Sequence, residues 1–190
     1  MMENNVKRFD NLLTTDKTAL LIIDIQERII RVINEYEKVI ENTIKLIKGF
    51  KVLGIPIYYT EQYPKGLGPT VESIQNELEG TEAIQKLSFS CSGAGDLFNE
   101  LKKNGISQIV VCGVESHVCV QQTVLDLIAN KFQVNLTADA VSSRRKKDYE
   151  ISLSRMRQYG ADVTTTEAIL FELLNVCGTD VFRQISKIVK

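Results

Sequence analysis

Six short apolar runs recur along the chain, and segments with helical periodicity separate them. The runs cover residues 19–23, 55–60, 83–85, 108–112, 132–137 and 161–164. Continuous apolar runs rich in β-branched residues are typical of strands that are buried on both faces, as in a parallel sheet. The pattern therefore predicts six strands, of which the third is the weakest.

The segments between these runs have the spacing of helices. One helical face, with the i, i+3, i+4, i+7 spacing, carries Tyr36, Val39, Ile40, Thr43, Ile44 and Ile47. We expect that helix to end at Gly54, and we expect further helices near 97–104, after Cys119 and near 151–159. Residues 65–69 are expected to form a loop. Alternating strands and helices predict a three-layer α/β fold with a doubly wound, six-stranded parallel sheet.

Size and composition fit one globular domain. The chain has 190 residues, 44% of them apolar, which is enough to bury a full core. We predict a single domain over residues 1–190, with a polar N-terminal extension over 1–16 and a helical tail over 177–190.

Charge and cysteine usage narrow the possible partners. Lysine plus arginine number 23 against 24 acidic residues, so nucleic acid is not an expected partner, because its binders usually carry a basic surplus. No apolar run approaches the about 18 residues that span a membrane, and the N-terminus lacks the apolar stretch of a signal peptide. Four cysteines without a CxxC pair do not suggest a disulfide framework. These features predict a reduced, cytoplasmic setting with no membrane partner.

Three residues with chemical potential follow the ends of predicted strands. Asp24 ends the first run, Lys86 follows the third, and Cys119 follows the fourth after a turn at Gly113. With strand order 3-2-1-4-5-6, these ends converge where the order reverses, which is where open α/β sheets bind ligands. A thiol in the first turn of a helix is also expected to have a lowered pKa, which would make Cys119 the most reactive of the four thiols.

Each of the three residues also has a plain structural explanation. Asp24 could serve only as a helix N-cap, Lys86 as solvated surface, and Cys119 as a small buried apolar side chain. Their joint position at one edge of the sheet is what favours a nucleophile, a carboxylate base and a cation that act together.

The segments around these residues resemble the isochorismatase-like, or cysteine hydrolase, superfamily over nearly the whole chain. The matching segments are residues 20–26, 86–89, 112–120, 139–144 and 164–167. The resemblance implies a triad of Asp24, Lys86 and Cys119. It also implies a cis peptide between Val114 and Glu115, and an oxyanion hole made by the backbone N–H groups of Glu115 and Cys119.

The activity implied by the resemblance is hydrolysis of a small amide or related C–N bond through a thioester on Cys119. Residues 60–68 lack the aspartate and histidines that metal-bearing relatives carry there, and His117 is the one histidine of the chain. We therefore expect no metal and no cofactor. Residues 61–68, together with residues 114–119, look closest to the isochorismatase-domain-containing subgroup. Candidate pocket residues are Gln62, Tyr63, Phe89, Val114 and His117.

Two other classes of protein were weighed against this hydrolase. A dinucleotide-binding domain is disfavoured because the first strand leads to Asp24 and not to a glycine-rich turn. A non-catalytic binding or scaffold protein with the same fold stays open. We also expect a homo-oligomer, because the apolar residues of one C-terminal segment exceed what one helix face needs. These residues are Ile169, Leu170, Phe171, Leu173 and Leu174.

Overall fold

The computed structural model describes residues 7–190, and its centre is a six-stranded sheet with all strands parallel. The strand order is β3-β2-β1-β4-β5-β6, as the sequence predicted. The strands are β1 (Thr18–Ile23), β2 (Ile57–Gln62), β3 (Ile84–Lys86), β4 (Gln108–Val114), β5 (Gln133–Ser142) and β6 (Asp162–Thr164).

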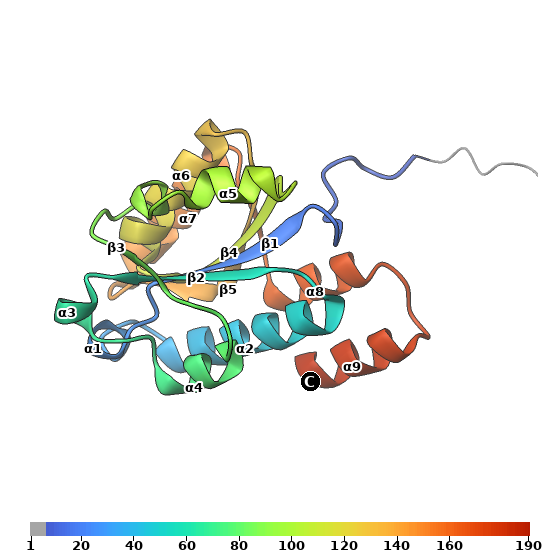
Figure 1. Cartoon of the computed structure of the whole chain (residues 1–190), viewed down its shortest axis with the longest axis horizontal. Coiled ribbons are helices and arrows are strands. Elements are labelled where there is room, and N and C mark those ends of the chain that lie inside the picture. Colours follow the sequence, from blue (N-terminus) through green and yellow to red (C-terminus); the bar gives the residue numbers. More distant parts are fainter. Residues whose placement is uncertain (1–6) are drawn as a thin grey trace, which may run out of the picture.

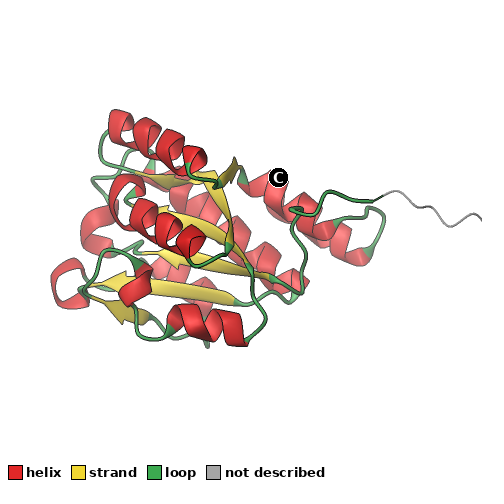
Figure 2. Cartoon of the chain, turned by 90° about the horizontal axis from the view of Figure 1, so that it is seen from above, coloured by secondary structure: helices red, strands yellow, loops and turns green. Residues whose placement is uncertain are grey.

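Helices cover both faces of this sheet and complete the predicted three layers. On one face lie α2 (Tyr36–Leu53), α4 (Glu72–Gln75), α8 (Thr166–Leu174) and α9 (Asp180–Val189); on the other lie α5 (Leu97–Lys103), α6 (Gln121–Ala129) and α7 (Lys146–Gln158) (Figure 1). Figure 2 shows the same layers from a second direction, with helices in front of and behind the strands.

Short helical turns lie at the connections. They are α1 (Glu27–Ile30), α3 (Pro64–Leu67), two 3-10 turns, η1 (Asn76–Leu78) and η2 (Cys91–Gly93), and a π-helical turn, η3 (Ser116–Val120). The short helix α3 corrects the expectation of a loop over residues 65–69, and it is too brief to leave a periodic pattern in the sequence.

The two faces of the central strand explain its continuous apolar run. All six residues of β1 are buried. Leu20 and Ile22 pack into the core beneath α2 and α8, whereas Leu21 and Ile23 pack into the core beneath α5 and α6. Successive side chains of a strand point to opposite faces, so a strand with helices on both sides needs apolar residues at every position.

Part of the predicted N-terminal extension belongs to the folded body. Residues 1–6 lie outside the described residues. Leu13 is buried, and its N–H donates to Glu172 Oε1 at 2.6 Å, while the N–H of Thr14 donates to Gln108 Oε1 at 2.9 Å. The polar composition of this segment concealed these anchors.

The apolar excess in α8 is covered by the chain itself. Ile169, Leu170, Leu173 and Leu174 are all buried in the core that α8 shares with α2 and α9. Phe171 lies against Phe182 of α9, with ring centroids 6.4 Å apart. These residues therefore give no reason to expect a partner chain, which corrects that part of the sequence argument.

Over residues 7–190, we find no helix that is both long enough and apolar enough to cross a membrane.

Candidate functional site

The carboxyl ends of the central strands gather the three chemically capable residues. Ile23, the last residue of β1, lies opposite Gly113 of β4, and Gln62 at the end of β2 lies opposite Lys86 at the end of β3. Asp24 follows β1 directly, and Cys119 lies in η3, just after β4. The sheet therefore brings Asp24, Lys86 and Cys119 to one edge, at its switch point.

Asp24 is a buried carboxylate whose two oxygens have separate partners. Oδ2 accepts a hydrogen bond from Lys86 Nζ at 2.6 Å, and Oδ1 accepts one from Thr60 Oγ1 at 2.7 Å. The backbone of Asp24 is left-handed, with φ 53°. Such a conformation costs about 1–3 kcal/mol in a non-glycine residue and tends to be kept at functional sites. Asp24 is not the N-cap of α1, because that position is occupied by Gln26.

Lys86 is a buried ammonium whose protons are all engaged. Besides Asp24, its Nζ donates to Gln62 Oε1 at 2.9 Å, to the carbonyl of Phe89 at 3.0 Å and to the carbonyl of Ser88 at 3.3 Å. An ammonium has three protons, so four acceptors saturate it. Lys86 therefore orients Asp24 and has no donor left for a ligand. The plain explanation, a solvated surface lysine, is wrong.

The Cys119 thiol is nearly buried, and its pKa is raised, not lowered. Burial is the main cause, the charge of Asp24 and a hydrogen bond to it add to the rise, and Lys86 opposes it. The sequence-based expectation of a lowered Cys119 pKa is therefore wrong, because desolvation outweighs the position at a helix start. Asp24 lines the same cavity as the thiol and is the carboxylate placed to remove its proton.

The turn before Cys119 has the cis peptide bond between Val114 and Glu115. Glu115 is buried, and its Oε1 accepts hydrogen bonds from Arg144 Nε at 2.9 Å and from the Arg144 N–H at 3.2 Å. The carbonyl of Glu115 accepts from the N–H groups of Val118 and Val120. These contacts fix the backbone on which Cys119 is mounted.

A cavity of about 100 Å³ opens beside the thiol. Asp24, Glu115 and Cys119 line it together with three of the predicted pocket residues, Gln62, Phe89 and Val114. Its other walls are Ile29, Leu67 and Val118, which the sequence did not indicate.

Two predicted pocket residues lie elsewhere. Tyr63 is half exposed and is absent from the lining of the cavity. His117 points away, with Nδ1 at 2.9 Å from Ser143 Oγ, and it is not a base for Cys119.

Buried polar residues behind the triad went unnoticed in the sequence. Gln26 accepts from the N–H of Gln62 at 2.8 Å and donates to the Gln62 carbonyl at 3.0 Å, so it fixes the residue that binds Lys86. Thr60 Oγ1, which donates to Asp24, also lies 3.8 Å from the Cys91 thiol. Neither residue type is unusual in its segment, so only the strand register could have revealed these roles.

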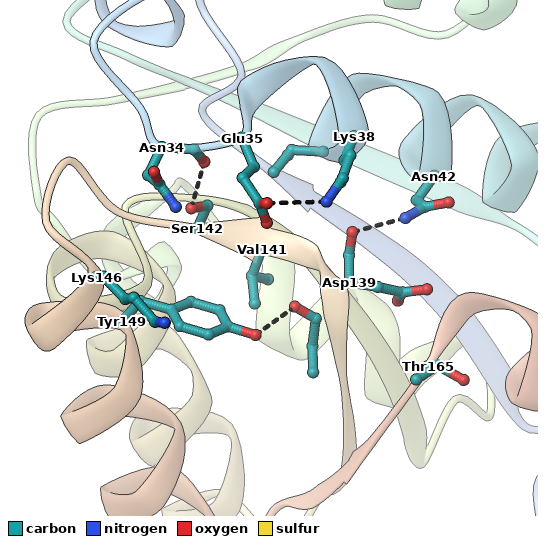
Figure 3. A pocket seen from close by; sticks show the side chains of 12 residues that line it. Asn34, Glu35, Lys38, Asn42, Asp139, Val141, Ser142, Lys146, Tyr149 and Thr165 are labelled. Atoms are coloured by element: carbon teal, nitrogen blue, oxygen red, sulfur yellow. Dashed lines mark hydrogen bonds and ion pairs between the residues drawn. The ribbon is translucent and has the colours of Figure 1, made fainter.

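A larger cavity of about 540 Å³ lies between α2, β5 and α7 (Figure 3). Several of its polar side chains bind one another or the backbone: Glu35 pairs with Lys38 at 2.8 Å, and Tyr149 donates to the carbonyl of Ala138 at 2.8 Å. Asn42 donates to the Asp139 carbonyl at 2.7 Å. It contains no thiol and no histidine, so the smaller cavity beside Cys119 is the candidate active site.

Among residues 7–190, no group of three or more His, Cys, Asp or Glu side chains is placed to hold a metal ion. All four cysteines of the chain are free thiols, with Cys91 and Cys112 buried and Cys177 exposed.

Comparison with known proteins agrees with this geometry. The sequence model of the isochorismatase domain family matches residues 18–168, which include Asp24, Lys86 and Cys119. The chain belongs to the isochorismatase family. Isochorismatase family protein 1B of Dictyostelium discoideum is 38% identical over 180 residues, covering 92% of this chain and 87% of the relative.

Solved structures share this isochorismatase-family hydrolase fold. The MAR1 ribonuclease of Caenorhabditis elegans superposes with a TM-score of 0.88 and 34% identity, over 93% of this chain and 91% of the nematode protein. The YcaC protein of Escherichia coli, described as an octameric hydrolase of unknown specificity, superposes with a TM-score of 0.87. The superposition covers 96% of this chain and 91% of the E. coli chain. Because the two sequences are only 22% identical, this likeness supports the fold alone.

Proposed function

We propose that this chain is a metal-independent cysteine hydrolase that cleaves a small amide or related C–N bond. One observation carries the proposal: the Asp24 carboxylate and the Cys119 thiol line the same cavity. Asp24 is buried and is held by hydrogen bonds from Lys86 at 2.6 Å and Thr60 at 2.7 Å. A nucleophile beside an oriented base is the arrangement that covalent catalysis requires.

In the first half of the reaction, Asp24 removes the Cys119 proton and the sulfur attacks the acyl carbon. The backbone N–H groups of Glu115 and Cys119 are assigned to the developing oxyanion. The C–N bond breaks, Asp24 gives its proton to the leaving nitrogen, and ammonia or an amine departs. The product is a thioester on Cys119.

In the second half, water attacks the thioester. Asp24 takes a proton from that water, the C–S bond breaks, and the proton returns to sulfur, so that the acid is released and the thiol is restored. Lys86 keeps Asp24 oriented through both halves of the reaction, because the Lys86 ammonium is itself held by fixed acceptors. No step requires a metal or a cofactor.

Two alternatives remain distinct from this proposal. A scaffold protein that keeps the fold without turnover would need neither the thiol nor the carboxylate. The nematode relative is named a ribonuclease, but the residues that line the candidate cavity here include two carboxylates and no cation that could bind a phosphodiester. We therefore favour an uncharged acyl substrate. Assembly into a homo-oligomer stays a prediction.

The proposal is tested by incubating the purified protein with a panel of small amides and measuring released ammonia. Cys119→Ser is the matched variant, because it changes one atom at the proposed nucleophile. Turnover that disappears in Cys119→Ser supports the hydrolase. Turnover that persists in Cys119→Ser excludes the thioester route, and a wild-type protein that cleaves no amide and no activated acyl ester favours the scaffold.

A further inference from the structure

We infer, on the basis of the proposed cysteine hydrolase activity, that the substrate is an amide with a short, uncharged, aliphatic acyl group. The inference concerns what the cavity beside Cys119 admits, and it stands on the size, the charge and the rigidity of that cavity.

The size of the cavity limits the acyl group. Its volume is about 100 Å³. A water molecule takes about 30 Å³ in the liquid, so the cavity holds on the order of three to five non-hydrogen atoms. That is the size of propionamide, or of the isobutyryl group of isobutyramide, each of which has about five non-hydrogen atoms. An aromatic ring with its amide exceeds it.

The charge of the cavity excludes anionic substrates. Two residues with charged side chains line the cavity, Asp24 and Glu115, and both are acidic. The nearby cations are already bound: Lys86 is saturated by four acceptors, and Arg144 holds Glu115 at 2.9 Å. A carboxylate on the substrate would be buried in this cavity without a cationic partner, which is strongly unfavourable.

Apart from the Cys119 thiol and Gln62, whose amide is bound to Lys86 and to the Leu87 carbonyl, the remaining walls are apolar. They are the side chains of Ile29, Leu67, Phe89, Val114 and Val118. An apolar acyl chain is the group that gains free energy from contact with such walls, whereas hydroxyls or charges would lose their hydration. The acyl part of the substrate is therefore hydrocarbon.

The walls are held in place, so the cavity does not widen freely around a larger ligand. The segment that carries Leu67 is tied down on the side of α1: Gln26 Nε2 donates to the Gly68 carbonyl at 2.7 Å, and Arg28 Nη1 donates to the Gly66 carbonyl at 2.9 Å. Phe89 is tied through its carbonyl to Lys86. Phe89 is also half exposed, which places it at the mouth of the cavity.

The turnover test compares kcat/KM for isobutyramide, benzamide and malonamate. These are a short neutral amide, an aromatic neutral amide and a short anionic amide. We expect isobutyramide to exceed each of the others by at least about 100-fold, the scale of discrimination that a tight pocket achieves. In Phe89→Ala, the benzamide to isobutyramide ratio should rise by about 10-fold. Tyr63→Ala is the matched control, because Tyr63 is equally exposed but outside the cavity, and it should leave the ratio unchanged.

A labelling test reads the same pocket without turnover. In a Cys177→Ser background, alkylation of Cys119 by iodoacetamide, iodoacetate and N-phenyl iodoacetamide is measured by peptide mapping, with each rate divided by the rate for glutathione. The small neutral reagent should be favoured over the other two by about 10-fold or more. A preference for the anionic or the aromatic reagent, or for malonamate or benzamide as substrate, overturns the inference. If labelling shows the expected order but no amide is cleaved, the pocket assignment survives and the proposed hydrolase activity fails.

Discussion

At the scale of single residues, burial decides the chemistry. Asp24, Lys86 and Cys119 were recognisable in the sequence because each follows a strand of an open parallel sheet. Their protonation was not recognisable, since it depends on how much water the fold removes. The sequence predicted a lowered pKa for Cys119, whereas burial and the charge of Asp24 raise that pKa. The thiol must therefore be deprotonated during the reaction.

Alkylation should reveal this difference among the four thiols. We expect iodoacetamide to label the exposed Cys177 first and Cys119 second. Cys91 and Cys112 should be slowest, because both are fully buried, whereas Cys119 lines a cavity that a small reagent can enter. Since the pKa of Cys119 lies above its usual value of about 8.5, its labelling rate should still be rising at pH 9. A Cys119 rate that levels off below pH 8, measured by peptide mapping, would contradict the raised pKa.

Asp24→Asn should remove turnover without unfolding the chain. Asparagine keeps an oxygen that can accept from Lys86, but it cannot take the thiol proton. Loss of a general base lowers kcat by about 10²–10⁴-fold. The check is kcat on any amide that the wild type cleaves, with circular dichroism as the control for folding. Near-full turnover in a folded Asp24→Asn variant would show that the base lies elsewhere.

At the scale of elements, regular periodicity was readable and short turns were not. The long helix α2 and the buried strand β1 carry patterns that repeat several times, so they were predicted. The helices α1 and α3 supply the cavity walls Ile29 and Leu67. Each of these helices has four residues, which is too short to show the i, i+3, i+4, i+7 spacing of apolar residues. The π-helical geometry of η3 likewise depends on tertiary packing that no local pattern encodes.

The carboxyl end of β4 depends on Gly113, which lies inside the strand and not in the turn that the sequence predicted there. This residue has φ 121°, and a Cβ there would lie 2.1 Å from the carbonyl oxygen of Ile23. We expect Gly113→Ala to lower the free energy of unfolding by on the order of 3–5 kcal/mol, since strain and overpacking add. Gly105→Ala is the matched control, because its φ is 76° and nothing lies within 4 Å. That variant should lose only about 1 kcal/mol. Equal losses in denaturant unfolding would contradict the steric account.

At the scale of the whole molecule, the sheet order follows from general rules and the location of the site follows from the order. Helices on both faces force a parallel sheet, and reversal of strand order between β1 and β4 creates the crevice. Long-range anchors were beyond prediction: Leu13 to Glu172 and Gln26 to Gln62 join segments that no local pattern relates. The same limit concealed that α2 and α9 cover the apolar excess of α8.

The protein as a whole should work without a metal. Activation of water by zinc normally needs three protein ligands, and over residues 7–190 no such cluster is present. We expect dialysis against a chelator to leave amide hydrolysis unchanged, and elemental analysis to find less than about one metal ion per ten chains. Loss of activity that returns with added zinc, manganese or iron would contradict this expectation.

The most direct test of the central claim is to trap the acyl group on sulfur. The protein is mixed with p-nitrophenyl isobutyrate, quenched in acid within one turnover, digested and analysed by mass spectrometry. The account predicts one isobutyryl group on the peptide that contains Cys119, no such group in Cys119→Ser, and much slower acylation in Asp24→Asn. Turnover with Cys119 unmodified, or full turnover by Cys119→Ser, would contradict it.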